Sequence, residues 1–246
     1  MTLRIVQLTD LHLPPDAAAP AWANLRRVLE HLGRHEATPD LLVLTGDLVA
    51  RRRAASYARL REALGAYQGR LRVLPGNHDS RRMLLAEFGD LLERVGPAAA
   101  FELDCRGWRL LGLDSVRRPF VHGAFGRVQL AWFAARVREA GAPVLVFVHH
   151  PPIRVGTWWL DKDLPRDRRR LESAVRGSRV RAIVCGHVHQ PHEGAFGGVP
   201  VLTSPSTAYQ FAPRAWLPGK ASWRPAYRVL ELEPDGALRS RVVALA

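Results

Sequence analysis

The sequence predicts an α/β layered fold with two sheets. Short apolar runs of strand length alternate with longer segments of helical periodicity through most of the chain. Towards the end, strand patterns follow one another without helices between them, which indicates a second sheet. The chain has 246 residues, of which 47% are hydrophobic, so it can fill a large core. We expect one domain over residues 1–246, because polar motifs spread from residue 10 to residue 189 have to meet at one site.

The first half of the chain follows a regular strand–helix order. Four consecutive apolar residues at 41–44 are typical of a strand that is covered on both faces. Pro20 suits the first turn of a helix, and Ser80 suits the N-cap of a helix that carries apolar residues as far as Leu92. Besides that helix, we expect strands at residues 3–9, 41–44, 71–74, 99–104 and 108–113, and helices at residues 20–36 and 54–67.

The second half supplies further strands. Leu130, Phe133 and Val137 share one face of a predicted helix. The Asp-Gly pair at residues 235–236 lies between two apolar runs, which is a strong short-range signal for a hairpin. We expect helices at residues 129–140 and 171–175, and strands at residues 144–148, 180–184, 199–202, 227–232 and 238–243.

Five polar motifs follow predicted strands, each where the strand ends. Because active residues collect at the carboxyl ends of strands in α/β sheets, we expect these motifs to form one site. Each motif alone is compatible with an ordinary turn or loop, whereas all five in this order are not. The motifs are Asp10-Leu-His12, Gly46-Asp47, Gly76-Asn77-His78-Asp79, His149-His150-Pro-Pro and Gly186-His187-Val-His189.

The motifs together offer carboxylate oxygens, an amide oxygen and imidazole nitrogens. This is the ligand set of two divalent metal ions that share a carboxylate, whose two oxygens can hold ions about 3.5–4 Å apart. His187 and His189 would point to opposite sides of an extended chain. Both can face metals only if the backbone bends, and Gly186 is well placed to allow that bend.

In this order the motifs resemble the calcineurin-like metallophosphoesterase superfamily over nearly the whole chain. The segments 185–190 and 204–207, with Gln210-Phe211 after them, are similar to those of bacterial class III cyclic-nucleotide phosphodiesterases. The resemblance implies a four-layer α/β/β/α sandwich, with two mixed sheets flanked by helices and a dinuclear centre between the sheets. It also implies hydrolysis of a phosphodiester, with 3′,5′-cyclic AMP as the expected substrate and 5′-AMP as the product.

The resemblance assigns ligands to two metal ions, for which Mn, Fe or Zn would all suit the mixed donors. His149 is preferred to His150, because the family pattern places the ligand two residues before the first proline. One ion would be held by Asp10, His12 and His189, the other by Asn77, His149 and His187, with Asp47 as the bridge.

The implied reaction is attack on phosphorus by a hydroxide that bridges the metals, and Asp47 and His78 are the expected catalytic residues. His78 would protonate the leaving oxygen or neutralise phosphoryl charge. Asp79 is expected either to orient His78 or to act as a helix N-cap or first-turn carboxylate. The substrate-binding candidates are Asn77, His78, Trp158, Thr207, Tyr209 and Gln210. The aromatic residues among them could instead pack the core or a dimer surface.

Rival functions use the same motifs. A glycerophosphodiester hydrolase would need a smaller, more polar pocket, and a nuclease would use the basic clusters at residues 51–53 and 166–170. A non-catalytic scaffold that binds phosphate groups is disfavoured, because every predicted ligand is present. The formal net charge of +13 would suit nucleic acid, but lysine occurs only at Lys162 and Lys220, and a genomic preference for arginine on an ordinary solvated surface is the explanation we favour. We therefore favour a small-molecule diester over nucleic acid.

Composition also bears on compartment and assembly. No apolar run approaches the roughly 20 residues that span a bilayer, and the strand pattern begins within three residues, so no signal peptide is visible. Cys105 and Cys185 are the only cysteines and lie in or beside apolar strands, which suits reduced thiols and a cytoplasmic protein. A homodimer is one option, with the loop at Trp158-Trp159 as a candidate contact.

Overall fold

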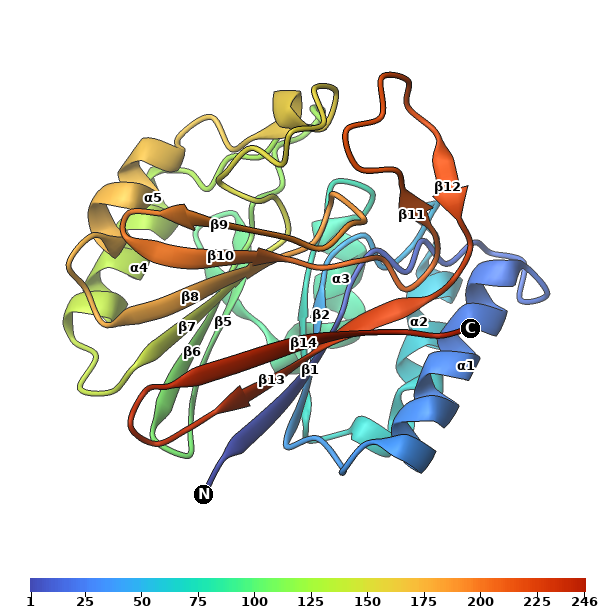
Figure 1. Ribbon diagram of the computed structural model, residues 1–246, viewed down its shortest axis with the longest axis horizontal. Helices are drawn as coiled ribbons and strands as arrows, with labels where there is room; N and C mark the ends of the chain where they lie inside the picture. The colour runs from blue at the N-terminus through green and yellow to red at the C-terminus, as the bar shows by residue number, and fades with distance from the viewer.

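The structure is a computed structural model that describes all residues from 1 to 246. It consists of two large mixed sheets packed face to face and flanked by helices, which confirms the predicted fold class (Figure 1). The first sheet has the strand order β14-β13-β1-β2-β3 and the second has the order β4-β5-β6-β7-β8-β10-β9. A two-stranded hairpin, β11-β12, stands apart from both sheets.

The strands of the first sheet come from both ends of the chain. They are β1 (Leu3–Leu8), β2 (Leu41–Thr45), β3 (Leu71–Leu74), β13 (Ala226–Leu232) and β14 (Leu238–Ala244). The first three are parallel to one another, and β13 pairs antiparallel with both β1 and β14. The predicted hairpin at the end of the chain therefore completes the first sheet.

The second sheet and the small hairpin use the middle of the chain. Their strands are β4 (Glu93–Val95), β5 (Ala98–Cys105), β6 (Trp108–Leu113), β7 (Val144–Val148), β8 (Val180–Cys185), β9 (His192–Phe196), β10 (Val199–Thr203), β11 (Gln210–Phe211) and β12 (Lys220–Ser222). Strands β6, β7, β8 and β10 are parallel neighbours. Strands β4, β9, β11 and β12 were not predicted, because they are short or lack an apolar alternation.

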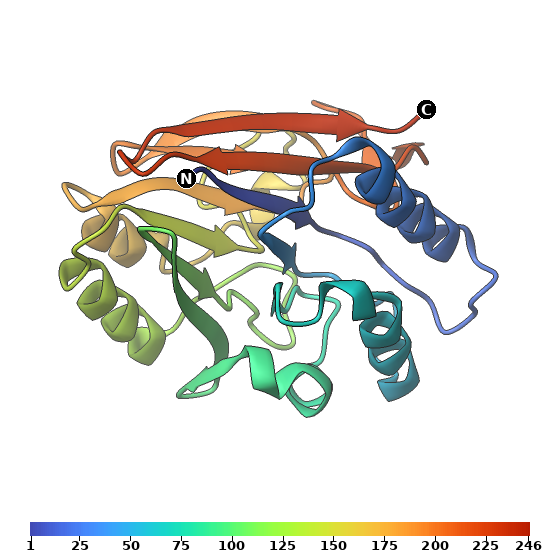
Figure 2. The ribbon, with the colours of Figure 1, turned by 90° about the horizontal axis from the view of Figure 1, so that it is seen from below.

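Helices cover the outer face of each sheet. Figure 2 shows α1 and α2 on one side of the paired sheets and α4 and α5 on the other. The helices are α1 (Pro20–His35), α2 (Ala54–Ala63), α3 (Arg81–Phe88), α4 (Arg127–Arg138) and α5 (Arg168–Val175), with single 3₁₀ turns at η1 (Gly65–Tyr67), η2 (Gly89–Leu91) and η3 (Asp161–Asp163). No helix is both long enough and apolar enough to cross a membrane.

Four helices have boundaries that differ from the predicted ones by two residues or more, and one of them, predicted at 171–175, begins earlier at Arg168. The helix predicted at 54–67 ends at Ala63, and residues from Gly65 form a separate 3₁₀ turn. The helix after Ser80 ends at Phe88, because the chain turns at η2 to enter β4 before Leu92 can join it. The helix predicted at 129–140 is shifted, since α4 begins at Arg127 and ends at Arg138.

The alternation of side chains along each strand builds the layers. In β1, Leu3 and Ile5 pack between the two sheets, whereas Val6 and Leu8 pack under the first group of helices. The layer between the sheets also contains Leu145 and Phe147 of β7, and a third cluster fills the space between the second sheet and α4 and α5. Both faces of the central strands are therefore apolar, and polar side chains are concentrated where these strands end.

Candidate metal centre

The predicted motifs come together at the carboxyl ends of β1, β2, β3, β7 and β8. Backbone hydrogen bonds tie the loops to one another: the Asp10 N–H donates to the Gly46 carbonyl at 3.0 Å, and the Gly186 N–H donates to the His149 carbonyl at 3.0 Å. The Ser206 hydroxyl donates to the Asp10 carbonyl at 2.7 Å, so the segment at residues 204–207 holds the loop after β1 in place. The two facing sheets thus deliver polar side chains to one place.

One group of side chains surrounds Oδ1 of Asp10. His189 Nε2 lies 3.2 Å from this oxygen and 3.1 Å from His12 Nε2. His12 Nε2 in turn lies 3.7 Å from Oδ2 of Asp47. Two imidazole nitrogens and two carboxylate oxygens therefore converge from three loops on one small volume.

A second group surrounds Oδ1 of Asn77. This amide oxygen lies 3.1 Å from His149 Nε2 and 3.1 Å from His187 Nδ1. His149 Nε2 is 3.5 Å from Oδ1 of Asp47, so each oxygen of Asp47 faces a different group. The donors therefore form two groups, one beside each oxygen of Asp47.

The donor atoms are those that a cation would satisfy. Oδ1 of Asp10 is buried without a hydrogen-bond partner, whereas its Oδ2 accepts hydrogen bonds from the Thr9 hydroxyl at 2.8 Å and from the His187 N–H at 2.9 Å. A buried carboxylate oxygen without a partner costs free energy. Histidine and carboxylate groups from these loops lie within 4.8 Å of one another in several triplets. The residues thus fit divalent cations.

The surroundings of these side chains favour the charged carboxylates of Asp10 and Asp47 and the neutral imidazole of His12. Burial raises the pKa of Asp10, but His189 and His149 outweigh it and bring the pKa down to about 2. Burial also acts on Asp47, and His149 and His12 nevertheless hold its pKa well below the ordinary value. Burial lowers the pKa of His12 to about 3, so its nitrogen is available as a ligand.

Backbone carbonyls orient two of the histidines. Nδ1 of His149 lies 2.8 Å from the Thr45 carbonyl, and Nδ1 of His189 lies 2.8 Å from the Tyr209 carbonyl. Each contact uses the ring nitrogen that faces away from the group, which leaves Nε2 as the metal-facing atom.

His150 is engaged differently from His149. Its Nδ1 lies 2.7 Å from the Ser115 hydroxyl, and its Nε2 lies 2.8 Å from the Val121 carbonyl. Both ring nitrogens of His150 therefore already have protein partners, although the ring packs against that of His187. This arrangement favours His149 as the ligand.

The backbone of the ligand loops is strained. Seven residues other than glycine have positive φ, and five of them are predicted ligands: Asp10, His12, Asp47, His187 and His189. Such conformations cost of order 1–3 kcal/mol each and persist where the surrounding structure fixes them. The bend expected at Gly186 lies instead at His187, with φ 70°, and at His189, with φ 49°. Gly186 is required for space, since a Cβ there would overlap the Thr9 hydroxyl.

His78 lies at the open side of the site. Its N–H donates to Oδ1 of Asp47 at 2.8 Å, and its Nε2 lies 3.9 Å from Oδ2 of the same residue. The side chain is 46% exposed and meets the His12 ring edge-on at 4.8 Å between ring centroids. His78 is thus held beside the ligand groups while its imidazole remains accessible to a substrate.

Asp79 fulfils neither of its two predicted roles. The carboxylate accepts hydrogen bonds from the N–H groups of Leu48, Val49 and Gly76 and from the Tyr57 hydroxyl, and not from the His78 ring. The N-cap of α3 is Ser80. Asp79 therefore joins the loops after β2 and β3, which positions the residues that those loops carry.

The predicted substrate residues divide into two groups. Asn77, His78 and Tyr209 lie among or beside the two groups of donor side chains around Asp10 and Asn77. The Tyr209 ring stacks on His12 with 5.2 Å between ring centroids. Thr207 is buried, and its hydroxyl donates to the Ala226 carbonyl. The Gln210 amide bonds the backbone of Ser206 and Arg224, and Trp158 contacts Trp216. We therefore do not expect Thr207, Gln210 or Trp158 to contact the substrate.

A cleft of about 290 Å³ adjoins His12 and His78. Its walls include Tyr209, Lys220 and Trp223, of which the last two were not predicted from the sequence. Lys220 and Trp223 belong to the β11-β12 hairpin and the segment after it, where the sequence has no periodic pattern. The only available signal was the presence of a lysine and a tryptophan in an otherwise unassigned segment.

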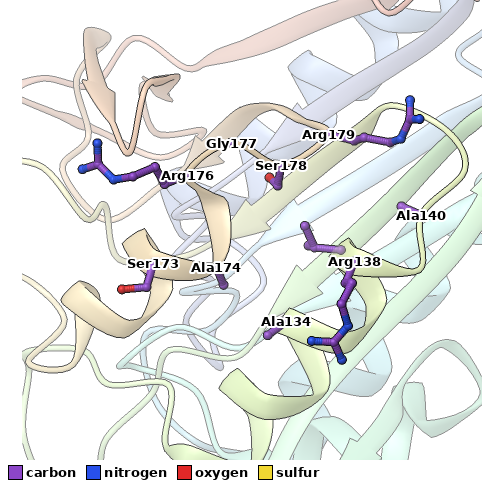
Figure 3. Close-up of a pocket in the computed structure, with 10 residues that line it drawn as sticks. Ala134, Arg138, Ala140, Ser173, Ala174, Arg176, Gly177, Ser178 and Arg179 are labelled. Carbon is purple, nitrogen blue, oxygen red and sulfur yellow. The ribbon is translucent and has the colours of Figure 1, made fainter.

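A larger hollow of about 630 Å³ lies elsewhere, between the carboxyl-terminal ends of α4 and α5, and shares no residue with the ligand groups (Figure 3). Arg138, Arg176 and Arg179 line it, and Figure 3 shows their guanidinium groups pointing in different directions. The cationic side chains of Arg138 and Arg176 suit the negative ends of the two helix dipoles. The hollow therefore does not form a focused site for one anion.

The fold and the carboxylate, amide and imidazole donors define a metal-dependent phosphodiester hydrolase. The family model for calcineurin-like phosphoesterases matches residues 3–191, and the chain belongs to this family. The chain is 31% identical to the 3′,5′-cyclic adenosine monophosphate phosphodiesterase CpdA of Escherichia coli, over 99% of this chain and 90% of the relative. It is 35% identical to a probable cyclic nucleotide phosphodiesterase of Synechococcus, over 98% of this chain and 92% of the relative.

Solved structures share the fold at low sequence identity. A purple acid phosphatase from yellow lupin seeds superposes with a TM-score of 0.65 and 11% identity, and covers 99% of this chain. This chain spans about half, 54%, of the lupin protein. GAP50, described as the anchor in the inner membrane complex of Plasmodium, superposes with a TM-score of 0.62 and 12% identity, over 99% of this chain and 84% of its own. These similarities concern the fold alone.

Proposed function

We propose that this protein hydrolyses a cyclic nucleotide to the 5′-monophosphate at a dinuclear metal centre, and that 3′,5′-cyclic AMP is its main substrate. The observation that carries the proposal is the position of Asp47, whose Oδ1 faces the Asn77 group and whose Oδ2 faces the Asp10 group. The substrate assignment is supported by relatives named as cyclic nucleotide phosphodiesterases that align over nearly the whole chain.

The residues present would hold two divalent cations. Asp10, His12 and His189 would bind one, Asn77, His149 and His187 would bind the other, and Asp47 would be shared. When bound, such ions supply positive charge to the phosphoryl oxygens and lower the pKa of water towards neutrality. Mn, Fe or Zn suits the mixed oxygen and nitrogen donors.

The chain's own contribution to the reaction is positioning and proton transfer. The exposed imidazole of His78 can reach a phosphoryl group at the ligand groups and give a proton to the leaving oxygen. Arg52 supports this loop, because its guanidinium donates to the His78 carbonyl at 3.0 Å. The strained ligand loops hold their side chains in place before the substrate arrives.

Two further expectations belong to the same proposal. Cys105 and Cys185 are unpaired, which supports a cytoplasmic location. The homodimer stays a prediction, and Trp158 at 46% and Trp216 at 80% exposure are the side chains with which we would test it.

A panel of diesters tests the function. We expect the purified protein with Mn²⁺ to convert 3′,5′-cyclic AMP to 5′-AMP, and to lose this activity after chelation. The panel should include cyclic GMP, 2′,3′-cyclic AMP, a glycerophosphodiester and single-stranded DNA. Faster turnover of the glycerophosphodiester would indicate a glycerophosphodiester hydrolase, and faster turnover of DNA would indicate a nuclease. Binding of these diesters without metal and without turnover would favour a non-catalytic scaffold. His149→Ala should abolish turnover, whereas His35→Ala on the surface of α1 should not.

A further inference from the structure

The cleft beside His12 and His78 has one apolar wall and one aromatic wall. The apolar wall consists of small side chains from the loop after β1, the start of α1 and the loop after β2: Pro14, Ala19, Pro20, Ala21 and Ala50. The aromatic wall consists of Tyr209 and Trp223, whose ring centroids are 5.5 Å apart. The cleft volume of about 290 Å³ can accommodate a flat group of modest size.

Lys220 gives the aromatic wall a positive charge. Its Nζ lies 4.1 Å from the ring centroid of Tyr209 and 4.4 Å from that of Trp223. Ammonium groups within about 6 Å of an aromatic face are attracted by the ring, so one lysine holds both rings in position. The same charge lies at a cleft that opens onto the metal ligand His12, where an anionic substrate would arrive.

Both sides of the cleft are connected by a buried asparagine. Asn24 of α1 donates to the carbonyl of Ala208 at 2.9 Å and to that of Trp223 at 3.0 Å. The Gln210 amide fixes the hairpin at a second point, because it donates to the carbonyls of Ser206 and Arg224. These hydrogen bonds join the aromatic residues to α1, whose first residues also line the cleft. A ligand therefore need not pay the entropy of fixing the aromatic side of the cleft in place.

The chemistry of the walls selects between substrate classes. A nucleobase has two apolar faces, and stacking on an aromatic ring is worth roughly 1–3 kcal/mol per base. A glycerol or other polyol group would need several hydrogen-bonding partners, whereas six of the eleven residues that line the cleft are alanine or proline, whose side chains supply none. The cleft thus suits a base rather than a sugar alcohol.

We propose that this cleft is the base subsite, in which the nucleobase of the substrate packs against Trp223 and Tyr209 while its phosphate lies at the metal ligands. The proposal rests on the proposed function and adds to it the two residues Lys220 and Trp223. It also excludes Trp158, which lies on a different loop and contacts Trp216 and Lys162 instead.

The test compares two ligands that differ only in the base. AMP and ribose 5-phosphate carry the same phosphate on the same sugar, and their dissociation constants for the Mn²⁺-loaded protein can be measured by calorimetry. For Trp223→Ala we expect affinity for AMP to fall roughly 10-fold or more, with affinity for ribose 5-phosphate unchanged. The matched control is Trp216→Ala, an exposed tryptophan at the tip of the same hairpin, which should leave both constants unchanged.

Two outcomes for Trp223→Ala would overturn the proposal. They are an unchanged affinity for AMP, whether or not Trp158→Ala loses it, and an equal loss of affinity for AMP and for ribose 5-phosphate. Circular dichroism and the thermal midpoint establish that each variant is folded. Failure of the proposed function is distinguishable, since the wild-type protein would then hydrolyse another diester in the panel and not cyclic nucleotides, whatever Trp223→Ala does.

Discussion

The Nε2 atom of His187 lies 3.5 Å from Oδ2 of Asp163, while the Nδ1 atom of the same ring faces Asn77. His187 Nε2 is buried and has no hydrogen-bond partner at closer range, and Asp163 on η3 is the carboxylate nearest to it. Histidine ligands commonly donate their second ring N–H to a carboxylate, which orients the ring and raises its basicity. Asp163 is therefore placed to orient His187 towards the second ligand group.

Asp163→Asn should weaken binding of one metal ion by about 10–100-fold. The carboxylate is lost while the size of the side chain is kept, so the fold should remain. The measurement is the Mn²⁺ dissociation constant of each variant, and elemental analysis gives the number of manganese ions bound per protein chain. Asp235→Asn, in the exposed turn before β14, is the matched control and should bind as the wild type does. Equal metal affinity in both variants would contradict the role of Asp163.

Removal of the shared carboxylate should affect both ions, whereas removal of the amide should affect one. Asp47→Asn keeps one oxygen of two, so we expect low occupancy of both positions after dialysis. Asn77→Ala removes a ligand of the second group alone, so about one ion per chain should remain. Elemental analysis of the two variants gives the number of metal ions per chain. Two tightly bound ions in Asp47→Asn would contradict the proposal that Asp47 is shared by both ions.

The clustering of the predicted ligands could be foreseen because β1, β2, β3, β7 and β8 read as short apolar runs, and the polar residue after each run falls at the same edge. The expectation that Asp10 and Asp47 bind metal came from the resemblance to calcineurin-like metallophosphoesterases, because each motif alone is compatible with an ordinary turn. The bend was misplaced at Gly186, because nothing in sequence alone indicates that a histidine adopts positive φ, as His187 does. Tertiary contacts impose that conformation.

Residues whose role depends on distant backbone groups could not be predicted. Asp79 follows a strand as a ligand would, yet its oxygens accept hydrogen bonds from N–H groups of the neighbouring loop. The Gln210 amide is used in the same way. Lys220 and Trp223 lie in or beside strands of two and three residues, too short for any periodicity to appear.

His78→Ala should keep the metal ions and lose turnover. The side chain is half exposed, and although His78 lies in one triplet with His12 and Asp47, it is not one of the predicted ligands, so metal content should equal that of the wild type. Loss of a general acid lowers the rate by about 10²–10⁴-fold for a poor leaving group such as a ribose oxygen. The loss should be much smaller for a p-nitrophenyl diester, whose leaving group needs no proton. An equal loss for both substrates would exclude the proton-donor role.

The stability of the metal-free protein should fall as the pH rises through the range of His149. Burial lowers the pKa of His149, but the carboxylate of Asp47 outweighs it and raises the pKa to about 9, against an ordinary value of 6.5. The native state therefore holds a proton that the unfolded state has released. The stabilisation from this group is complete below pH 6.5 and is lost as the pH rises through about 9.

The check is the thermal midpoint of the chelated protein between about pH 6.5 and pH 9.5, where we expect a decline. His149→Gln should flatten this decline, because the titrating group is gone. Saturating Mn²⁺ should flatten it as well, since a metal ion takes the neutral imidazole as its ligand. An equally steep decline in His149→Gln would assign the pH dependence to another group.

Gly76→Ala should disrupt the site through a single methyl group. A Cβ at residue 76 would overlap both Oδ1 and the backbone nitrogen of Asp47, and these atoms cannot move without displacing the shared ligand. Overpacking of this kind costs about 1–3 kcal/mol, so we expect a lower midpoint in urea together with weaker metal binding. Gly33→Ala in α1 is the matched control: a Cβ there meets nothing within 4 Å, and alanine favours the helix by about 0.8–1 kcal/mol. Chemical denaturation of the two variants should therefore move in opposite directions, and a Gly76→Ala protein as stable and as metal-rich as the wild type would show that the loop after β3 can shift away from Asp47.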